Sequence, residues 1–212
     1  MTQQGLFLTL EGVDGAGKST HIPFMKQVLQ AHNISVVVTR EPGGTPLGES
    51  LRELLLQQPM RLKTECLLMF AARNEHIQTR VLPALKKGQW VLCDRFTDAS
   101  YAYQGGGRAL GTEQIRVLEQ WVHAGLQPDR TWLFDVPLDL ARQRMLNTRV
   151  LDRFEKEDVE FFIRTQQAYY DRVHQDPQRF YMVDASRDIQ TIQNQLNKEL
   201  LALIDSWRGV AS

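Results

Sequence analysis

The stretch of sequence that decides the fold is Gly12-Val13-Asp14-Gly15-Ala16-Gly17-Lys18-Ser19, and Thr20 continues it. It fits the phosphate-binding pattern G-x-x-x-x-G-K-S/T, follows an apolar run at residues 6–10 and opens a helical pattern at Lys18. Glycines let the backbone curl so that successive N–H groups point at an anion, and the amino terminus of the following helix adds partial positive charge. The stretch therefore predicts a purine-nucleotide site. Within it we expect Lys18 to contact the β- and γ-phosphates and the Ser19 hydroxyl to ligate Mg²⁺.

Short apolar runs alternate with helical patterns along the rest of the chain. The apolar runs are residues 6–10, 34–39, 90–93, 131–136 and 180–183, and they are typical of strands buried on both faces of a parallel sheet. The helical patterns are residues 18–32, 47–56, 65–85, 113–124, 159–174 and 189–207. We predict an α/β fold, a three-layer α/β/α sandwich with a five-stranded parallel sheet, formed by residues 1–212 as one domain. Right-handed crossovers then place ligand sites at the carboxyl ends of the strands.

Composition narrows the class of protein further. Lys and Arg together number 25 and so do Asp and Glu, so the 212 residues carry no net charge and nucleic-acid binding is disfavoured. The chain has no apolar run of the ~18 residues that a membrane span needs, and its first residues lack a signal-peptide pattern. Cys66 and Cys93 are too few and too far apart for a disulfide framework or a zinc site. We expect a cytoplasmic protein that has neither nucleic acid nor a membrane as its partner.

Three further motifs supply candidates for the group that receives the phosphate. Residues 40–45, REPGGT, form a tight turn with an acid and a base directly after the apolar run at 34–39. Phe70 and Arg73 lie three residues apart on one helix face, where a ring and a guanidinium together suit a base and its phosphate. Asp94 and Arg95 follow the run at 90–93. The acid suits a Mg²⁺ ligand and the guanidinium suits a phosphate, although a buried pair with a purely structural role explains them too.

Together with the P loop, these motifs resemble the thymidylate kinase family, in the nucleoside monophosphate kinase group of P-loop proteins. The resemblance runs from about Leu6 to the carboxyl-terminal helix and rests on residues 11–20, 40–45, 68–73, 94–96 and 101–105. It implies a fold of the P-loop kinase type and transfer of a phosphoryl group from ATP to dTMP, giving dTDP and ADP, with Mg²⁺. It also implies a homodimer that packs helix against helix, for which residues 65–85 are the candidate surface.

The resemblance further implies roles for single residues of an acceptor pocket. Phe70 is expected to stack on thymine, Arg73 to hydrogen-bond the base and Arg95 to bind the acceptor phosphate. The other implied contacts are Ser100 and Gln104 near the base, Tyr103 beside the deoxyribose, where it crowds any 2′-hydroxyl, and Asp14 and Glu41 near the 3′-hydroxyl or the metal. A phosphate monoester is already an anionic nucleophile, so catalysis needs no general base and consists of positioning and charge neutralisation.

A basic segment between two predicted helices, residues 142–156, is the candidate lid. It contains Arg142, Arg144, Arg149 and Arg153, whereas Gly15 and Ala16 leave the P loop without an arginine. The resemblance is therefore to the bacterial type, in which lid arginines neutralise charge on the transferring phosphoryl group. We expect Arg149 and Arg153 to do so, completing a catalytic set with Lys18, Arg95 and Asp14. Arg142 and Ser186 are expected to border the adenine.

Two other functions fit part of this pattern. A P-loop kinase for an unphosphorylated deoxynucleoside shares the architecture, but it does not need both Arg73 and Arg95 beside its pocket. A P-loop ATPase that switches partners acts without an acceptor and needs no counterpart of Phe70 and Tyr103. The favoured hypothesis is a Mg²⁺-dependent kinase that acts on dTMP.

Overall fold

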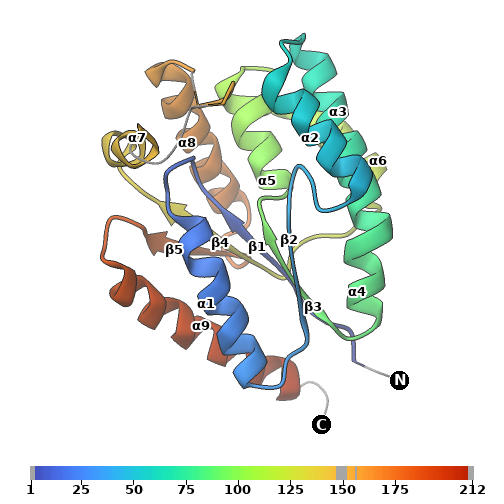
Figure 1. Ribbon diagram of the computed structural model, residues 1–212, viewed down its shortest axis with the longest axis vertical. Helices are drawn as coiled ribbons and strands as arrows, with labels where there is room; N and C mark the ends of the chain where they lie inside the picture. Colours follow the sequence, from blue (N-terminus) through green and yellow to red (C-terminus); the bar gives the residue numbers. More distant parts are fainter. Residues whose placement is uncertain (1–2, 147–151, 156, 210–212) are drawn as a thin grey trace.

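The computed structural model describes residues 3–146, 152–155 and 157–209 of the chain. Its centre is a five-stranded, all-parallel sheet with helices on both faces (Figure 1). The strands are β1 Phe7–Glu11, β2 Val36–Arg40, β3 Trp90–Asp94, β4 Arg130–Asp135 and β5 Phe180–Asp184, and they lie in the order β2-β3-β1-β4-β5. The predicted α/β/α sandwich is confirmed, and each predicted strand ends within two residues of its observed bounds.

The predicted helical patterns are helices in the structure, with two differences. The helical segments are α1 Lys18–Ala31, α2 Pro46–Gln57, α3 Leu62–His76, the π-helical turn η1 Ile77–Val81, α4 Leu82–Lys86, α5 Thr97–Ser100, the π-helical turn η2 Tyr101–Gly107, α6 Thr112–His123, α7 Leu138–Leu146, α8 Val159–Gln175 and α9 Ile189–Gly209. The single helix predicted at 65–85 is interrupted by η1, because Pro83 has no N–H to continue the α-helical hydrogen bonds. The helical segment at 97–107 was not predicted. Among the described residues, no helix is both long and apolar enough to cross a membrane.

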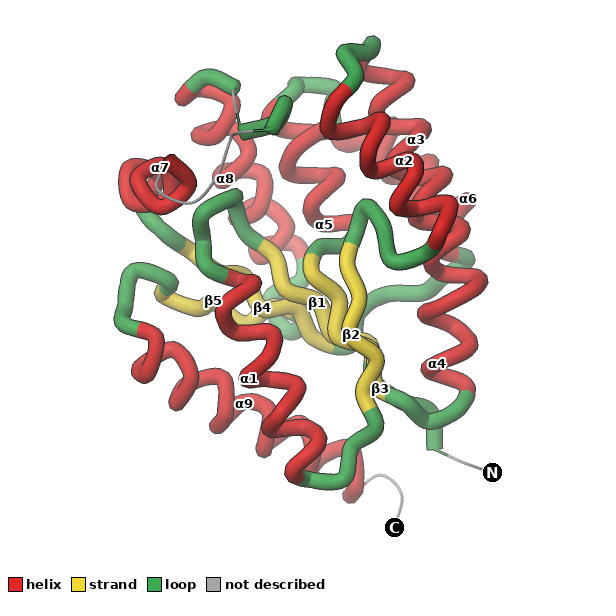
Figure 2. The backbone as a smooth tube through the Cα atoms, viewed as in Figure 1, coloured by secondary structure: helices red, strands yellow, loops and turns green. Residues whose placement is uncertain are grey.

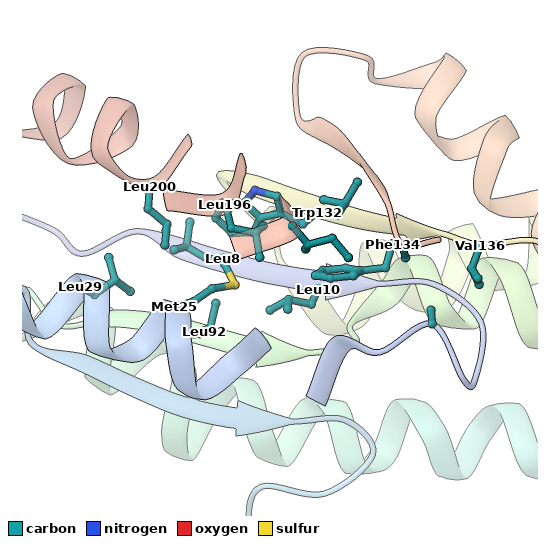
Figure 3. Close-up of a cluster of buried hydrophobic side chains, with 14 of the residues drawn as sticks. Leu8, Leu10, Met25, Leu29, Leu92, Trp132, Phe134, Val136, Leu196 and Leu200 are labelled. Atoms are coloured by element: carbon teal, nitrogen blue, oxygen red, sulfur yellow. The ribbon is translucent and has the colours of Figure 1, made fainter. Parts of the chain in front are cut away.

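Both faces of the sheet are buried because apolar side chains alternate between its two sides. Leu8 and Leu10 of β1 point to one side together with Leu92 of β3, and all three pack in the cluster that α1 and α9 cover (Figure 3). Phe7 and Val91 point to the opposite side, where η1 and α4 cover them. These are the two faces that the continuous apolar runs in the sequence predict.

The layer formed by α1 and α9 fixes the start of α1 against the sheet. Met25 and Leu29 of α1 and Leu196 and Leu200 of α9 are fully buried in this layer. Burying a side chain of this size contributes about 1.5–3 kcal/mol, so the helix is firmly held. The loop between β1 and α1 therefore stands at a defined place at the carboxyl end of the sheet, with the loops that follow β2 and β3 beside it (Figure 2).

The turn η2 lies close against α8, and two glycines allow that approach. A Cβ on Gly106 would stand 2.6 Å from the Cβ of Ala168, and a Cβ on Gly107 would stand 2.6 Å from Cε2 of Phe161. Arg164 of α8 also donates two hydrogen bonds to the carbonyl of Gly107, at 3.1 and 2.8 Å. This packing fixes the backbone of η2, which carries the side chains of Tyr103 and Gln104 to the carboxyl end of the sheet.

Candidate active site

The P loop joins β1 to α1, as the sequence predicts. Gly12 has a φ of 134°, and a Cβ there would lie 2.5 Å from the carbonyl oxygen of Phe134, so the position requires glycine. Lys18 is buried, and its Nζ donates to the carbonyl oxygens of Gly12 at 3.0 Å and of Val13 at 3.2 Å. Burial and the positive charge of Arg95 lower the pKa of Lys18 to about 8. The loop thus holds its ammonium group in a fixed position.

A cleft runs along this loop, and we call it the P-loop cleft. It contains the predicted nucleotide-binding residues from Asp14 to Thr20, while the buried Gly12 and Val13 serve through the carbonyl groups that hold Lys18. Its other lining residues include Arg40, Glu41, Arg52, Asp94, Arg95, Arg144, Glu155, Ala185 and Arg187. The cleft therefore combines P-loop backbone with cationic side chains from several elements, which suits a polyphosphate.

Asp94 and Ser19, the predicted Mg²⁺ ligands, both line the P-loop cleft. The Oδ1 atom of Asp94 is buried and has no hydrogen-bond partner among the described residues. The described part of the chain also lacks a group of three or more His, Cys, Asp or Glu residues that would hold a metal alone. Mg²⁺ is commonly bound by one or two protein oxygens together with phosphate oxygens and waters, so the pair fits that ion.

Arg95 follows β3 in a left-handed backbone conformation, with a φ of 69°. Its Nη2 donates to Oδ1 of Asp14 at 2.7 Å and to the hydroxyl of Tyr103 at 2.9 Å, and its Nη1 donates to the hydroxyl of Tyr169 at 3.1 Å. Burial alone would raise the pKa of Asp14, but the charges of Arg95 and Lys18 outweigh it and lower that pKa to about 2. The guanidinium is therefore held beside a carboxylate that stays ionised.

Glu11, the last residue of β1, supports Arg95 from the sheet. It is fully buried and accepts hydrogen bonds from the N–H of Phe96 at 2.7 Å and from the hydroxyl of Tyr169 at 2.8 Å. Glu11 thus fixes both the residue that follows Arg95 and one of the side chains that Arg95 contacts. Burial and the negative charge of Asp98 raise the pKa of Glu11 to about 7.

A second cavity, which we call the side pocket, opens on the other side of Arg95. Its lining includes the predicted residues Glu41, Arg73, Ser100, Tyr103 and Gln104, together with Arg52, Met69, Asp152 and Phe154. These five predicted residues come from three separate segments of the sequence, and the structure brings them together in one pocket. The pocket is lined by both apolar and hydrogen-bonding side chains, which is typical of a small-molecule site.

Arg73 is held in the side pocket by three hydrogen bonds. Its Nε donates to Oε2 of Glu41 at 2.7 Å, and its Nη2 donates to the carbonyl of Phe96 at 3.0 Å and to the hydroxyl of Ser100 at 3.1 Å. The other oxygen of Glu41 lies 2.8 Å from Nδ1 of His76. Nη1 of Arg73 is buried without a hydrogen-bond partner among the described residues, so it is a donor that a ligand in the pocket can satisfy.

The two cavities share a wall. Asp14, Glu41, Arg52 and Arg95 line both the P-loop cleft and the side pocket. A phosphate bound in the P-loop cleft and a phosphate bound in the side pocket would therefore meet at these four residues. The two guanidinium groups at that meeting point suit the negative charge of a phosphoryl group that is transferred from one phosphate to the other.

The structure corrects the role predicted for Phe70. Its ring is only 2% exposed and packs in a cluster with Cys66, Tyr101 and Ile115, on the side of α3 that faces α6. The guanidinium of Arg73 lies over this ring, 4.5 Å from its centroid. The two side chains thus share a helix face, as predicted, but Arg73 lies between the Phe70 ring and the pocket. Met69, four residues before Arg73, lines the side pocket instead. One residue along a helix changes direction by about 100°, which places the two neighbours on different faces.

The described lid arginines lie at three different places. Arg153 forms an ion pair with Glu65 at 2.7 Å and donates to the carbonyl of Leu55 at 3.1 and 2.8 Å, so it is directed away from the P loop. Arg142 is exposed and lines a separate cavity between α7 and α8, whereas Arg144 lines the P-loop cleft and donates to the carbonyl of Ala185 at 2.9 Å. Arg149 lies outside the described residues.

Ser186 is exposed and hydrogen-bonds to Asp184, and its neighbours Ala185 and Arg187 line the P-loop cleft. Its predicted place beside the adenine stays a prediction. Sequence reasoning missed Arg52, Met69 and Arg144 as lining residues. Met69 is recoverable from its i, i+4 spacing to Arg73, and Arg144 was counted among the lid arginines without being given a role.

A P loop that shares a wall of two guanidinium groups with a second pocket defines a class of protein. Such a site brings a nucleotide and a second phosphate-bearing small molecule together, which is the arrangement of a P-loop kinase.

Comparison with known proteins identifies the family within that class. The family model described as thymidylate kinase matches residues 10–196. A thymidylate kinase of Bordetella pertussis is 59% identical over 204 residues, which cover 96% of this chain and 98% of the relative. Thymidylate kinases of Janthinobacterium sp. and Cupriavidus necator are 57% and 56% identical and cover 95% and 92% of this chain, or 98% and 97% of the relatives. The chain belongs to the thymidylate kinase family, and it is an enzyme, as the sequence predicts.

The raised pKa of Glu11 predicts a pH-dependent contribution to stability. This pKa is about 7 in the folded chain against an ordinary value of 4.5. At a pH between these two values, folding is therefore accompanied by the uptake of a proton. The stability that it contributes is present below the unfolded pKa and is lost as the pH rises through the folded one. The free energy of unfolding of the wild type minus that of Glu11→Gln should fall by about 2 kcal/mol between pH 5 and pH 7. Urea unfolding at both pH values measures this difference, and a constant difference would contradict it.

Proposed function

We propose that this chain phosphorylates dTMP to dTDP, with ATP as the phosphoryl donor and Mg²⁺ as the cofactor. The observation that carries the proposal is the wall of Asp14, Glu41, Arg52 and Arg95 that the P-loop cleft and the side pocket share. ATP occupies the P-loop cleft, dTMP occupies the side pocket, and their phosphates meet at this wall. Residues 1–212 act as one P-loop kinase domain, with residues 142–156 as its lid segment.

On the donor side, the P loop binds the triphosphate through its backbone N–H groups and Lys18. Ser19 and Asp94 would hold Mg²⁺, which neutralises charge on the phosphate oxygens. Arg144 donates to the carbonyl of Ala185, and its Nη1 would stand 4.0 Å from a Cβ on Gly17, so its guanidinium lies between the P loop and the loop after β5. We assign the adenine to the part of the cleft beside Ala185, with Arg144 in the place that the sequence analysis gives to Arg142.

On the acceptor side, Arg73 and Met69 surround the base. Nη1 of Arg73, which has no hydrogen-bond partner in the described part of the chain, donates to a carbonyl oxygen of thymine. The Met69 thioether, in place of the Phe70 ring, provides the polarisable contact with the base. Tyr103 is fixed by its hydrogen bonds to Asp14 and Arg95, so its ring is a rigid neighbour for the sugar. A rigid ring at this place leaves little room for a 2′-hydroxyl.

Catalysis then consists of positioning and charge neutralisation. Arg95 is pre-organised by Asp14, Tyr103 and Tyr169, so it binds the acceptor phosphate without first having to be ordered. The acceptor oxygen is anionic and attacks without a general base. Lys18 and Arg95 cover the two ends of the transferring group, and we keep Arg149 as the proposed cation of the lid that covers its middle.

We also propose a homodimer, formed through α3 and α6. Leu67 on α3 and Val117 and Trp121 on α6 are exposed apolar side chains, and the Trp121 side chain is 80% exposed. The two helices pack against each other through Cys66, Phe70 and Ile115, so the exposed residues lie on neighbouring elements. Leu67 falls within residues 65–85, the surface named from sequence. The two cysteines of the chain are free and buried, which supports the proposed cytoplasmic location.

A panel of acceptors tests the function. With ATP and Mg²⁺, activity should be highest with dTMP, lower with dUMP and very low with the ribose form of TMP. Loss of one methyl group from an apolar contact costs only about 1–3 kcal/mol, so dUMP is weakened and not excluded. A coupled assay of ADP release measures all of these, with a reaction lacking acceptor as the control. Equal turnover of AMP or CMP would overturn the assignment, and release of ADP without acceptor would indicate an ATPase.

Substitution of Arg95 tests the shared wall. Arg95→Lys keeps the charge and loses the paired geometry of the guanidinium, so kcat/KM for dTMP should fall by more than about tenfold while ATP affinity barely changes. Arg116→Lys, in an exposed pair with Glu113, is the matched control. Steady-state kinetics with each substrate varied in turn give both values. Loss of ATP binding with the fold intact would instead place Arg95 on the donor side.

The oligomeric state tests the dimer. Trp121→Glu puts a charge into the proposed interface, and light scattering after size exclusion should show a dimer for the wild type and a monomer for the variant. Ile163→Glu on α8 changes a side chain that is 53% exposed and lies on a different helix, so it should leave the dimer intact. A wild-type monomer, or dissociation by both variants, would contradict this interface.

A further inference from the structure

Glu65, in the first turn of α3, is a fully buried carboxylate with no place in the phosphoryl transfer described above. Its Oε1 accepts hydrogen bonds from Nε2 of Gln104 at 2.9 Å and from Nε of Arg108 at 3.2 Å. Its Oε2 lies 2.7 Å from Nη1 of Arg153. One buried acid therefore contacts three side chains from two segments. Gln104 and Arg108 belong to η2 and the residue that follows it, and Arg153 belongs to the segment 152–155.

The hydrogen bond to Glu65 determines how the amide of Gln104 is turned. Oε1 of Glu65 also accepts from Arg108, whose guanidinium can only donate, so the NH₂ group of Gln104 has to face this oxygen and the amide carbonyl has to face elsewhere. Gln104 is buried and lines the side pocket. The amide is thus fixed so that it offers the ligand an acceptor. A thymine or uracil ring carries an N3–H donor that matches such an acceptor, whereas cytosine presents an unprotonated N3 there.

The same carboxylate secures the segment 152–155 beside the pocket. Arg153, which pairs with Glu65, also donates twice to the carbonyl of Leu55 in the last turn of α2, where helix carbonyls lack intrahelical partners. Phe154 is buried and lines the side pocket, and its ring lies 4.6 Å from the guanidinium of Arg153 and 5.3 Å from that of Arg108. The position of Phe154 therefore depends on cations that Glu65 holds.

We propose that Glu65 is a positioning residue that sets the base specificity of the side pocket, by fixing the amide of Gln104 and anchoring Arg153. This inference rests on the proposed function, because it takes the ligand of the side pocket to be a pyrimidine monophosphate. It gives Arg153 a structural task on the acceptor side, in place of the predicted task of neutralising charge on the transferring phosphoryl group.

Glu65→Gln tests the orientation of the Gln104 amide without opening a cavity, because glutamine has the shape of glutamate but no charge. A glutamine at this position accepts or donates, so the amide of Gln104 is no longer confined to one orientation, and Arg153 loses its counter-charge. KM for dTMP should rise by about tenfold or more, with kcat and KM for ATP changed far less. The ratio of kcat/KM for dTMP to that for dCMP should fall by about tenfold as well. Glu113→Gln, at an exposed ion pair, is the matched control and should leave all of these values unchanged.

A double-mutant cycle isolates the anchor. Arg153→Gln should raise KM for dTMP, and combining it with Glu65→Gln should add little, because both substitutions remove the same pair. Arg153→Gln alone should keep the preference for dTMP over dCMP, since Gln104 still has its carboxylate. Arg153 is partly exposed, so this variant keeps the test decisive if Glu65→Gln fails to fold. Fully additive effects, or an unchanged dTMP-to-dCMP ratio in a folded Glu65→Gln enzyme, would overturn the proposal.

Hydrogen exchange gives a readout that does not depend on turnover. Peptides that cover residues 152–155 should exchange faster in Glu65→Gln and Arg153→Gln than in the wild type, while peptides from α1 and α9 should not change. Unchanged exchange at 152–155 would contradict the anchor. The wild-type acceptor panel is measured first: if the wild type does not phosphorylate dTMP, the proposed function fails, whereas active wild type with unaffected variants refutes the role of Glu65 alone.

Discussion

The arrangement of this site depends on Arg95 being held at one place in a left-handed backbone conformation. A non-glycine residue with a φ of 69° is costly, and it persists only where the surroundings fix it. Here the N–H of the next residue is bound by Glu11, and the side chain is bound by Asp14, Tyr103 and Tyr169. The three side-chain partners come from the P loop, η2 and α8, so three segments of the chain converge on one guanidinium. That guanidinium is the boundary between the P-loop cleft and the side pocket.

The same principle recurs at Arg73, which Glu41, Ser100 and a backbone carbonyl orient in the side pocket. In both cases a carboxylate takes one edge of the guanidinium and thereby removes most of its rotational freedom before a ligand arrives. Glu41 is in turn bound by His76, so its carboxylate is fixed at both oxygens. Pre-organisation of this kind lowers the cost of binding a hydrogen-bond acceptor of the ligand, because the ordering has been completed during folding.

The sequence predicts the fold well because the information is local and repeated. Continuous apolar runs specify strands that are buried on both faces, and the P loop specifies which strand comes first. The predictions fail where the role of a residue depends on the direction in which its side chain points. Phe70 and Met69 are both apolar and adjacent, and only the packing of α3 on α6 decides which of them faces the pocket. Arg144 and Arg153 are both basic, and a buried acid that is 88 residues away from Arg153 in sequence decides where that arginine goes. The π-helical turn η2 depends on glycines that fit against α8, a contact that no periodicity reveals.

The absence of a net charge does not conflict with binding two phosphorylated molecules. Among the described lining residues of the P-loop cleft, six are Lys or Arg and four are Asp or Glu, so the local excess is small. A triphosphate beside a monophosphate brings more negative charge than this excess can neutralise. Asp14 keeps its negative charge in the cleft, because neighbouring cations lower its pKa to about 2. In the function proposed above, a divalent cation held by Asp94 and Ser19 supplies part of the missing charge, and Arg149 of the lid segment is the further cation that we propose. The low positive excess of the cleft is thus the physical reason for proposing both cations in a chain whose P loop carries no arginine.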